Sequence, residues 1–150
     1  MSRMQARMLP RGQRLHLNDG PIDLIISAEG APQDVSRALA AAEARFASVL
    51  DELCAELPLL RRAVGEEPEG TIARRMWRAV APLGARAFIT PMAAVAGSVA
   101  EEILDAMRAE ARLTRAFVNN GGDIALHLAE GESCVLGLVD RPDRPSIFAR

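Results

Sequence analysis

The chain has 150 residues and a formal net charge of −2, and 49% of its residues are apolar but only 3% aromatic. This length predicts a single domain, residues 1–150, with a core built from Ala, Leu, Val and Ile side chains. All 18 basic residues are arginine and they form no long run, so nucleic acid is not expected as a partner.

Localisation is predicted from three features of the sequence. Residues 1–16 contain no apolar run typical of a secretory signal. Residues 87–100 are the most apolar stretch, but they contain Pro91 and Gly97 and are too short to span a bilayer. Cys54 and Cys134 lack CxxC spacing and are expected to be buried thiols. We therefore expect a soluble, cytoplasmic protein with no membrane partner.

The first half of the chain predicts a hairpin followed by helices. Residues 15–26 alternate apolar and polar on both sides of the turn Asn18-Asp19-Gly20-Pro21, and His16 falls on the polar, solvated side. Residues 32–56 then repeat apolar positions every three or four residues, which predicts one long helix. A short helix is predicted over residues 71–80, with Thr71 as its cap. Three arginines on its outer face predict either a solvated surface or a site for an anion or a partner: Arg74, Arg75 and Arg78.

A second long helix follows a short buried strand predicted at residues 87–89. Thr90 is expected to cap this helix, which contains Pro91 in its first turn and runs to about Ala111. Its first two turns carry small side chains: Ala93, Ala94, Ala96, Gly97, Ser98 and Ala100. Such a surface allows close packing on a sheet, and free N–H groups at a helix start also receive anions.

The last part of the chain predicts strands at residues 115–118, 124–128 and 134–139, with a further strand at 147–149. Ile124, Leu126 and Leu128 share one face, and the strand at 134–139 is apolar on both faces and therefore expected to be buried. Short connections join antiparallel neighbours. The predicted fold is α+β, with a mixed, mainly antiparallel sheet packed by two long helices and one short helix.

The segment between the first two of these strands, residues 118–124, reads Val-Asn-Asn-Gly-Gly-Asp-Ile. Adjacent glycines allow positive φ and let backbone N–H groups approach a ligand closely. Asn-Gly between two strands is also the usual signal for a hairpin. The segment therefore predicts either a simple turn or a cradle for a phosphate or a ring edge.

The chain resembles the ApbE family of FAD:protein FMN transferases in two motifs and in their order. The motifs are Thr-Pro-Met-Ala-Ala-Val-Ala-Gly at residues 90–97 and Val-Asn-Asn-Gly-Gly-Asp-Ile-Ala at 118–125. The chain is more similar still to an uncharacterised family of ApbE-like proteins. The resemblance implies a small-molecule nucleotide ligand, with FAD or FMN as the cofactor. It places the cofactor-binding site at Thr90, Gly97, Asn119, Asn120, Gly121, Gly122 and Asp123.

The chain departs from the transferase pattern where chemistry would occur. Ala96 stands at the family's lysine position, and the magnesium-binding motif near the C-terminus has no counterpart. We therefore assign no catalytic residue and expect no magnesium in this chain alone. Two alternatives stay open: a divergent FMN transferase completed by a missing C-terminal part or a second chain, and a structural or interaction module that has lost the site. The open edge expected at residues 147–149 predicts an N-terminal portion of a longer protein, or a homo-oligomer.

Overall fold

A computed structural model describes residues 4–10, 13–137 and 143. Five strands form one sheet in the order β1-β2-β3-β4-β5, and all neighbouring pairs are antiparallel. The strands are β1 (Gln5–Leu9), β2 (Arg14–Asp19), β3 (Ile22–Gly30), β4 (Leu113–Asn120) and β5 (Asp123–Leu128). The predicted α+β class with a mainly antiparallel sheet is confirmed.

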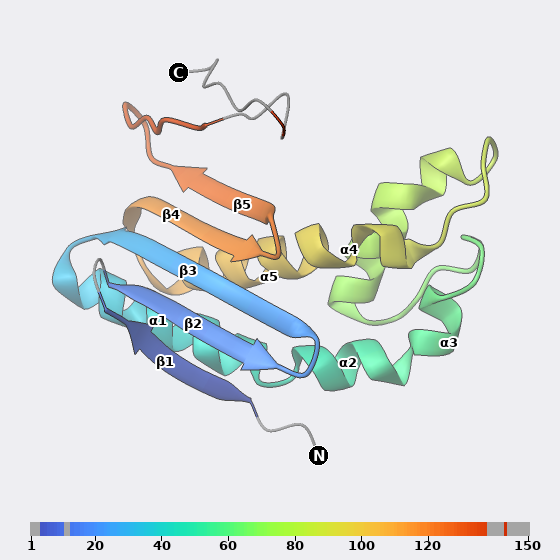
Figure 1. The fold of residues 1–150 in the computed structure, drawn as a ribbon, viewed down its shortest axis with the longest axis horizontal. Coiled ribbons are helices and arrows are strands. Elements are labelled where there is room, and N and C mark those ends of the chain that lie inside the picture. Colours follow the sequence, from blue (N-terminus) through green and yellow to red (C-terminus); the bar gives the residue numbers. More distant parts are fainter. Residues whose placement is uncertain (1–3, 11–12, 138–142, 144–150) are drawn as a thin grey trace.

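The helices connect β3 to β4; in Figure 1 the two long helices, residues 32–46 and 95–110, lie behind the sheet, and the others lie to its right. They are α1 (Pro32–Phe46), α2 (Val49–Ala55), α3 (Leu57–Leu60), α4 (Thr71–Val80) and α5 (Val95–Glu110), with the 3-10 turns η1 (Ala81–Leu83) and η2 (Pro91–Ala94). Helix α1 packs on β3, and α5 packs on β4 and β5. Among the described residues, no helix is long and apolar enough to cross a membrane.

The core lies between the sheet and this helical layer. Alternation along β2 and β3 buries Leu17, Leu24 and Ile26 completely on the helical side, where they join Phe46 and Ile103. Side chains at alternate positions point to the opposite face of a strand. The sheet therefore has one face covered by helices, and no helix of the described chain covers the other.

The long helix predicted over residues 32–56 is interrupted, and this prediction is corrected to two helices. α1 ends at Phe46 and α2 begins at Val49, with both of these side chains fully buried. Between them, the Ser48 hydroxyl contacts the Arg45 carbonyl oxygen at 3.5 Å and accepts a hydrogen bond from the Arg45 guanidinium at 2.9 Å. Local side-chain bonds of this kind compete with the helical backbone pattern.

Three predicted local features are wrong. Residues 87–89 form no strand and Phe88 is 83% exposed, because this segment links η1 to η2 beside the helices instead of entering the sheet. Residues 134–137 form no strand, and their apolar side chains are largely exposed. Cys54 is exposed on the outer side of α2, and Cys134 is only half-buried, so neither is a fully buried thiol. Residues 138–139 and the strand predicted at 147–149 lie outside the described residues.

Strand β1 was not predicted, because its residues lack an apolar alternation. It is an edge strand with an almost fully exposed burial pattern. Polar and arginine-containing edges of this kind disfavour pairing with other chains. The absence of a hydrophobic pattern is therefore the normal sequence signature of such an edge.

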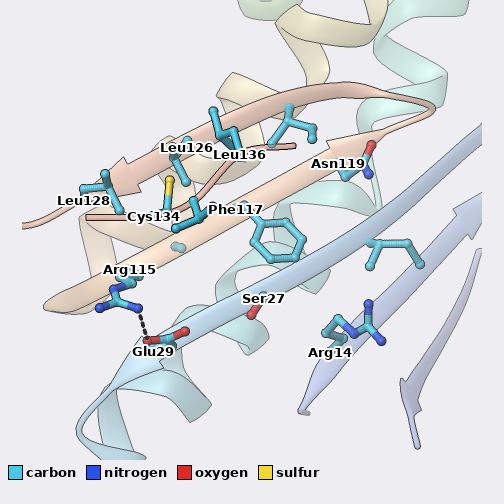
Figure 2. A pocket seen from close by; sticks show the side chains of 14 residues that line it. Arg14, Ser27, Glu29, Arg115, Phe117, Asn119, Leu126, Leu128, Cys134 and Leu136 are labelled. Atoms are coloured by element: carbon cyan, nitrogen blue, oxygen red, sulfur yellow. Dashed lines mark ion pairs between the residues drawn. The ribbon is translucent and has the colours of Figure 1, made fainter. Parts of the chain in front are cut away.

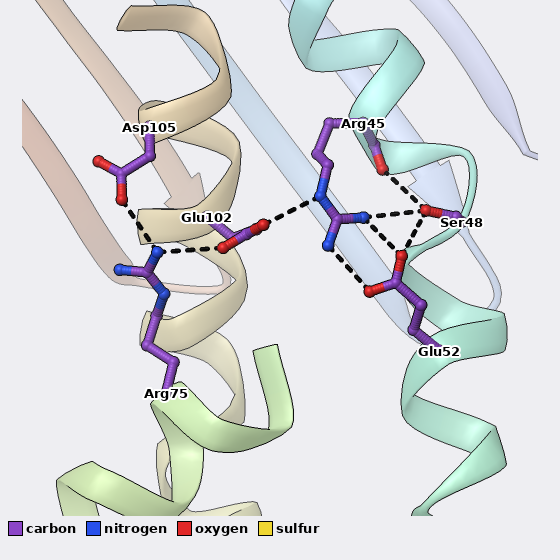
Figure 3. Close-up of polar contacts among 6 residues, drawn as sticks. All are labelled: Arg45, Ser48, Glu52, Arg75, Glu102 and Asp105. Carbon is purple, nitrogen blue, oxygen red and sulfur yellow. Dashed lines mark hydrogen bonds and ion pairs between the residues drawn. The ribbon is translucent and has the colours of Figure 1, made fainter. Parts of the chain in front are cut away.

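Ion pairs hold the helical layer together, as Figure 3 shows. Glu102 on α5 contacts Arg45 on α1 and Arg75 on α4, each at 3.0 Å. Arg45 also binds Glu52 at 2.8 Å, and this hydrogen bond lowers the pKa of the Glu52 carboxyl. Of the arginine trio on α4, Arg75 is bound to α5, and the other two lie 3.8 Å from Glu67. Their charges therefore face acidic partners within the chain.

Candidate functional site

The glycine segment forms the tight turn between β4 and β5. Asn120 pairs with Asp123, which leaves Gly121 and Gly122 as a two-residue loop with φ of 63° and 107°. Positive φ at both central residues is typical of a type I′ hairpin turn. The local structure is thus a hairpin, and a role as a ligand cradle stays a prediction.

The two asparagines before this turn point to opposite faces of the sheet. The Oδ1 atom of Asn119 accepts a hydrogen bond from the Gly122 N–H at 2.9 Å. The Nδ2 atom of Asn120 donates to the Ala96 carbonyl oxygen at 3.2 Å. The second bond holds the turn against the beginning of α5, so the structure brings the two predicted motifs side by side.

The other predicted site residues lie around this contact. Thr90 caps the 3-10 turn η2 instead of a long α-helix, and it makes no side-chain capping bond. A Cβ atom added at Gly97, Gly121 or Gly122 would meet no atom within 4 Å, so the space above each is open. Asp123 is exposed, and its carboxyl has no side-chain partner within the described ranges. Nucleotide binding by these residues stays a prediction.

A cleft of about 590 Å³ lies on the face of the sheet opposite the helices (Figure 2). Side chains of β2 to β5 and residues 134–136 line it. Its apolar walls are Ile25, Phe117, Ile124, Leu126, Leu128, Val135 and Leu136. The apolar residues of β5 therefore project from the uncovered face of the sheet. Ala125 projects from the opposite face, where it is buried on the helical side.

Strand register arranges the cleft residues in rows across the sheet. One row is Arg14, Ser27, Phe117 and Leu126, each opposite the next on the neighbouring strand. The adjacent row places Asn119 between Ile25 and Ile124. Directly paired residues project from the same face. Asn119 is thus the one predicted site residue that lines the cleft.

The charges of the cleft are unevenly paired. Arg115 binds Glu132 at 2.8 Å and lies 3.9 Å from Glu29. Arg14 is exposed and has no ion pair or side-chain hydrogen bond with any residue that the structure describes. One side of the cleft therefore has one cation between two carboxylates and is net negative, and the other carries a single unpaired cation.

A polar cluster on β1–β3 borders this face. His16 Nε2 lies 2.6 Å from Asp23 Oδ1, and Arg7 Nε donates to His16 Nδ1 at 3.2 Å. The hydrogen bond from His16 lowers the pKa of the Asp23 carboxyl. His16 is thus bound at both ring nitrogens and not simply solvated, which leaves neither nitrogen free to act as a base on a substrate.

Arg14, Ser27 and Phe117 were not predicted as site residues. Phe117 was visible in the apolar run before the glycine loop, but its neighbours were not, because β3 and β4 are far apart in the sequence. Across the described ranges, no group of three or more His, Cys, Asp or Glu side chains could hold a metal ion.

Comparison with known proteins corrects the family prediction. A family model described as AbpE bacteria matches residues 6–148, which is nearly the whole chain. The match does not identify an ApbE-like FMN transferase, so the predicted membership of an ApbE-like family is wrong. The two motifs behind that prediction form a helix start and a hairpin turn, local structures that occur in many folds. No curated protein and no solved structure matches the chain.

Proposed function

We propose that this chain, which belongs to the AbpE bacteria family, is a binding domain for a small ligand with a planar, largely apolar ring. The proposal rests on the cleft of about 590 Å³ on the uncovered face of the sheet. Its size falls within the roughly 300–1,000 Å³ of typical small-molecule sites. Such sites combine apolar walls with a few polar groups, as this cleft does.

The exposed apolar side chains of the cleft support the presence of an occupant. Ile124 and Leu126 are 54% and 42% exposed, although they lie on a regular strand. Contiguous exposed apolar surface of this kind commonly marks a binding surface. A ligand in the cleft would remove these side chains from water and so gain hydrophobic free energy.

The shape and chemistry of the walls favour a ring. Phe117 lies in the middle strand of the cleft, where its own ring can stack on an aromatic ligand. The Nδ2 amide of Asn119 has no partner in the described part of the chain and is available to a ring carbonyl or nitrogen. A flavin or a related nucleotide, the ligand class expected from the sequence, meets these requirements.

Isothermal titration of the full chain with FMN, FAD, NAD and ATP, with and without magnesium, tests the proposal. We expect saturable binding of at least one ring compound, weakened about tenfold or more in Phe117→Ala through loss of aromatic stacking and buried area. Phe88→Ala is the matched control, because Phe88 is exposed and lies outside the cleft. Absence of binding by every ligand, or equal weakening in both variants, would contradict the proposal.

A second candidate function is protein docking on the same face. Val135 and Leu136 are 75% and 54% exposed, which leaves the outer rim of the cleft apolar. Apolar cores surrounded by polar residues are typical of protein interfaces. Sedimentation across a range of chain concentrations separates the two candidates: self-association that Leu136→Ser abolishes favours docking of a second copy.

A further inference from the structure

We infer that the ligand of the cleft carries a phosphate group, which Arg14 binds on the β2 side. This inference rests on the proposed function, because it concerns the same cleft. It starts from the difference between the two arginines that line it. Arg115 is held by Glu132 and Glu29, whereas Arg14 faces no carboxylate within ion-pair distance in the described structure.

The residue opposite Arg14 supplies a second donor. Arg14 pairs in register with Ser27 on β3, and both side chains line the cleft. Ser27 is half-buried, and its hydroxyl has no hydrogen-bond partner in the described part of the chain. A guanidinium and a hydroxyl on adjacent strands can donate to different oxygens of one phosphate.

The register also fixes how far this phosphate lies from the ring. Arg14 and Phe117 are two strands apart in the same row, which corresponds to about 10 Å across the sheet. A ring over Phe117 and Leu126 would therefore be joined to its phosphate by a linker of several atoms. Ring compounds with a sugar-phosphate or sugar-alcohol phosphate arm have this layout.

The other charges of the cleft agree with this placement. Glu29 lies on the same face of β3 opposite Arg115, but Arg115 is shared with Glu132, so this side of the cleft is net negative and disfavours a phosphate. The Arg14 side is thus the one place in the described cleft where an added negative charge meets an unpaired positive one. Pairing of an arginine with a phosphate is charge-assisted and stronger than a neutral hydrogen bond.

Two matched pairs of probes test the inference on the full chain: riboflavin against FMN, and adenosine against AMP. Each pair shares a ring and differs by the phosphate. We expect the phosphorylated member of a bound pair to bind about tenfold more tightly at low salt, as one charge-assisted hydrogen bond predicts. Raising the salt concentration should reduce this advantage, because the site is exposed.

Arg14→Gln should abolish the phosphate advantage and leave the affinity for riboflavin or adenosine unchanged. Arg14→Lys should retain part of it, because the charge remains but the forked geometry is lost. Arg61→Gln is the control, since Arg61 is an exposed arginine outside the cleft with no side-chain partner among the described residues. Unchanged thermal unfolding of each variant verifies that the fold is intact.

The outcomes separate the two proposals. Equal affinities within a bound pair, or a phosphate advantage that survives Arg14→Gln, would overturn the phosphate inference while ring binding stands. Failure of all four compounds to bind would overturn the phosphate inference, and the proposed function would fall with it if FAD, NAD and ATP also failed to bind. Loss of the advantage in Arg14→Gln but not in Arg61→Gln supports both.

Discussion

The two adjacent glycines of the β4–β5 turn should respond oppositely to substitution. Gly121 has a φ of 63°, which asparagine tolerates well, and asparagine is the preferred first residue of a type I′ turn. Gly122 has a φ of 107°, which a β-branched residue adopts only under strain. Gly121→Asn and Gly122→Val therefore test the turn geometry at neighbouring positions.

The magnitudes follow from the open space around the turn. A Cβ at either glycine meets no atom within 4 Å, so only backbone preferences contribute. Gly122→Val should lower the free energy of unfolding by about 2 kcal/mol, within the usual range for a strained residue. Gly121→Asn should raise it by about 0.5 kcal/mol, because the unfolded chain loses freedom.

Urea unfolding followed by far-UV circular dichroism measures both variants, and thermal unfolding provides a second reading. The valine variant should melt about 4–8 °C lower, since 1 kcal/mol corresponds to about 2–4 °C in a chain of this length. Equal m-values would show that the compared states are the same. If Gly121→Asn destabilised the protein as much as Gly122→Val, the turn would not have the type I′ geometry on which this reasoning depends.

Four further predictions concern other parts of the molecule. Glu102→Gln should destabilise the protein by about 2 kcal/mol in urea unfolding, because its carboxylate is only 13% exposed and bridges two helices. The control Glu101→Gln, at a 59%-exposed position, should lower the free energy of unfolding by about 0.5 kcal/mol or less. Equal losses in the two variants would contradict the bridging role. Phe46→Ala should cost about 3–5 kcal/mol through a cavity in the core, and a loss below about 1 kcal/mol would show that the side chain is not buried. The histidine beside Asp23 lowers the pKa of this carboxyl, so its contribution to stability is present above about pH 4 and is lost as the pH falls through the lowered pKa. The stability difference between wild type and Asp23→Asn should therefore be constant above about pH 5 and shrink progressively below about pH 4, and a difference that does not change in acid would refute the pairing. Asp123→Asn should leave the melting temperature nearly unchanged, because the carboxyl has no partner in the described structure. The same variant should change nucleotide affinity about tenfold if the loop binds the ligand as the sequence predicts.

Elements defined by local patterns were predicted well from the sequence. The hairpin of β2 and β3 follows from alternation on both sides of one turn, and α4 occupies the residues that its helical period indicates. The interruption at Ser48 was not predictable, because the apolar spacing continues across it. Periodicity indicates which side chains are buried, but not whether the backbone stays continuous.

The cleft depends on information that the local sequence does not contain. The pattern of β5 places Ile124, Leu126 and Leu128 on one face, but the same pattern is compatible with helices on either side. Only the packing of α5 on β5, together with the burial of Ala125, identifies the apolar face as the uncovered one. Similarly, Arg14 joins Phe117 in one row only through the register of β3 with β4.

The pairing of β3 with β4 also has a consequence for the order of folding. Thr114 donates a hydrogen bond to the Glu29 carbonyl oxygen although the two residues are 85 positions apart, whereas the β2–β3 and β4–β5 pairs are closed by two-residue turns. Closing the longer loop costs about 3 kcal/mol more conformational entropy than closing a turn. The two hairpins should therefore form early and independently, and the central pairing should form late, after the helices between them have collapsed. Folding should accordingly be slow for a protein of this size, with its rate set by the joining of two preformed halves of one sheet.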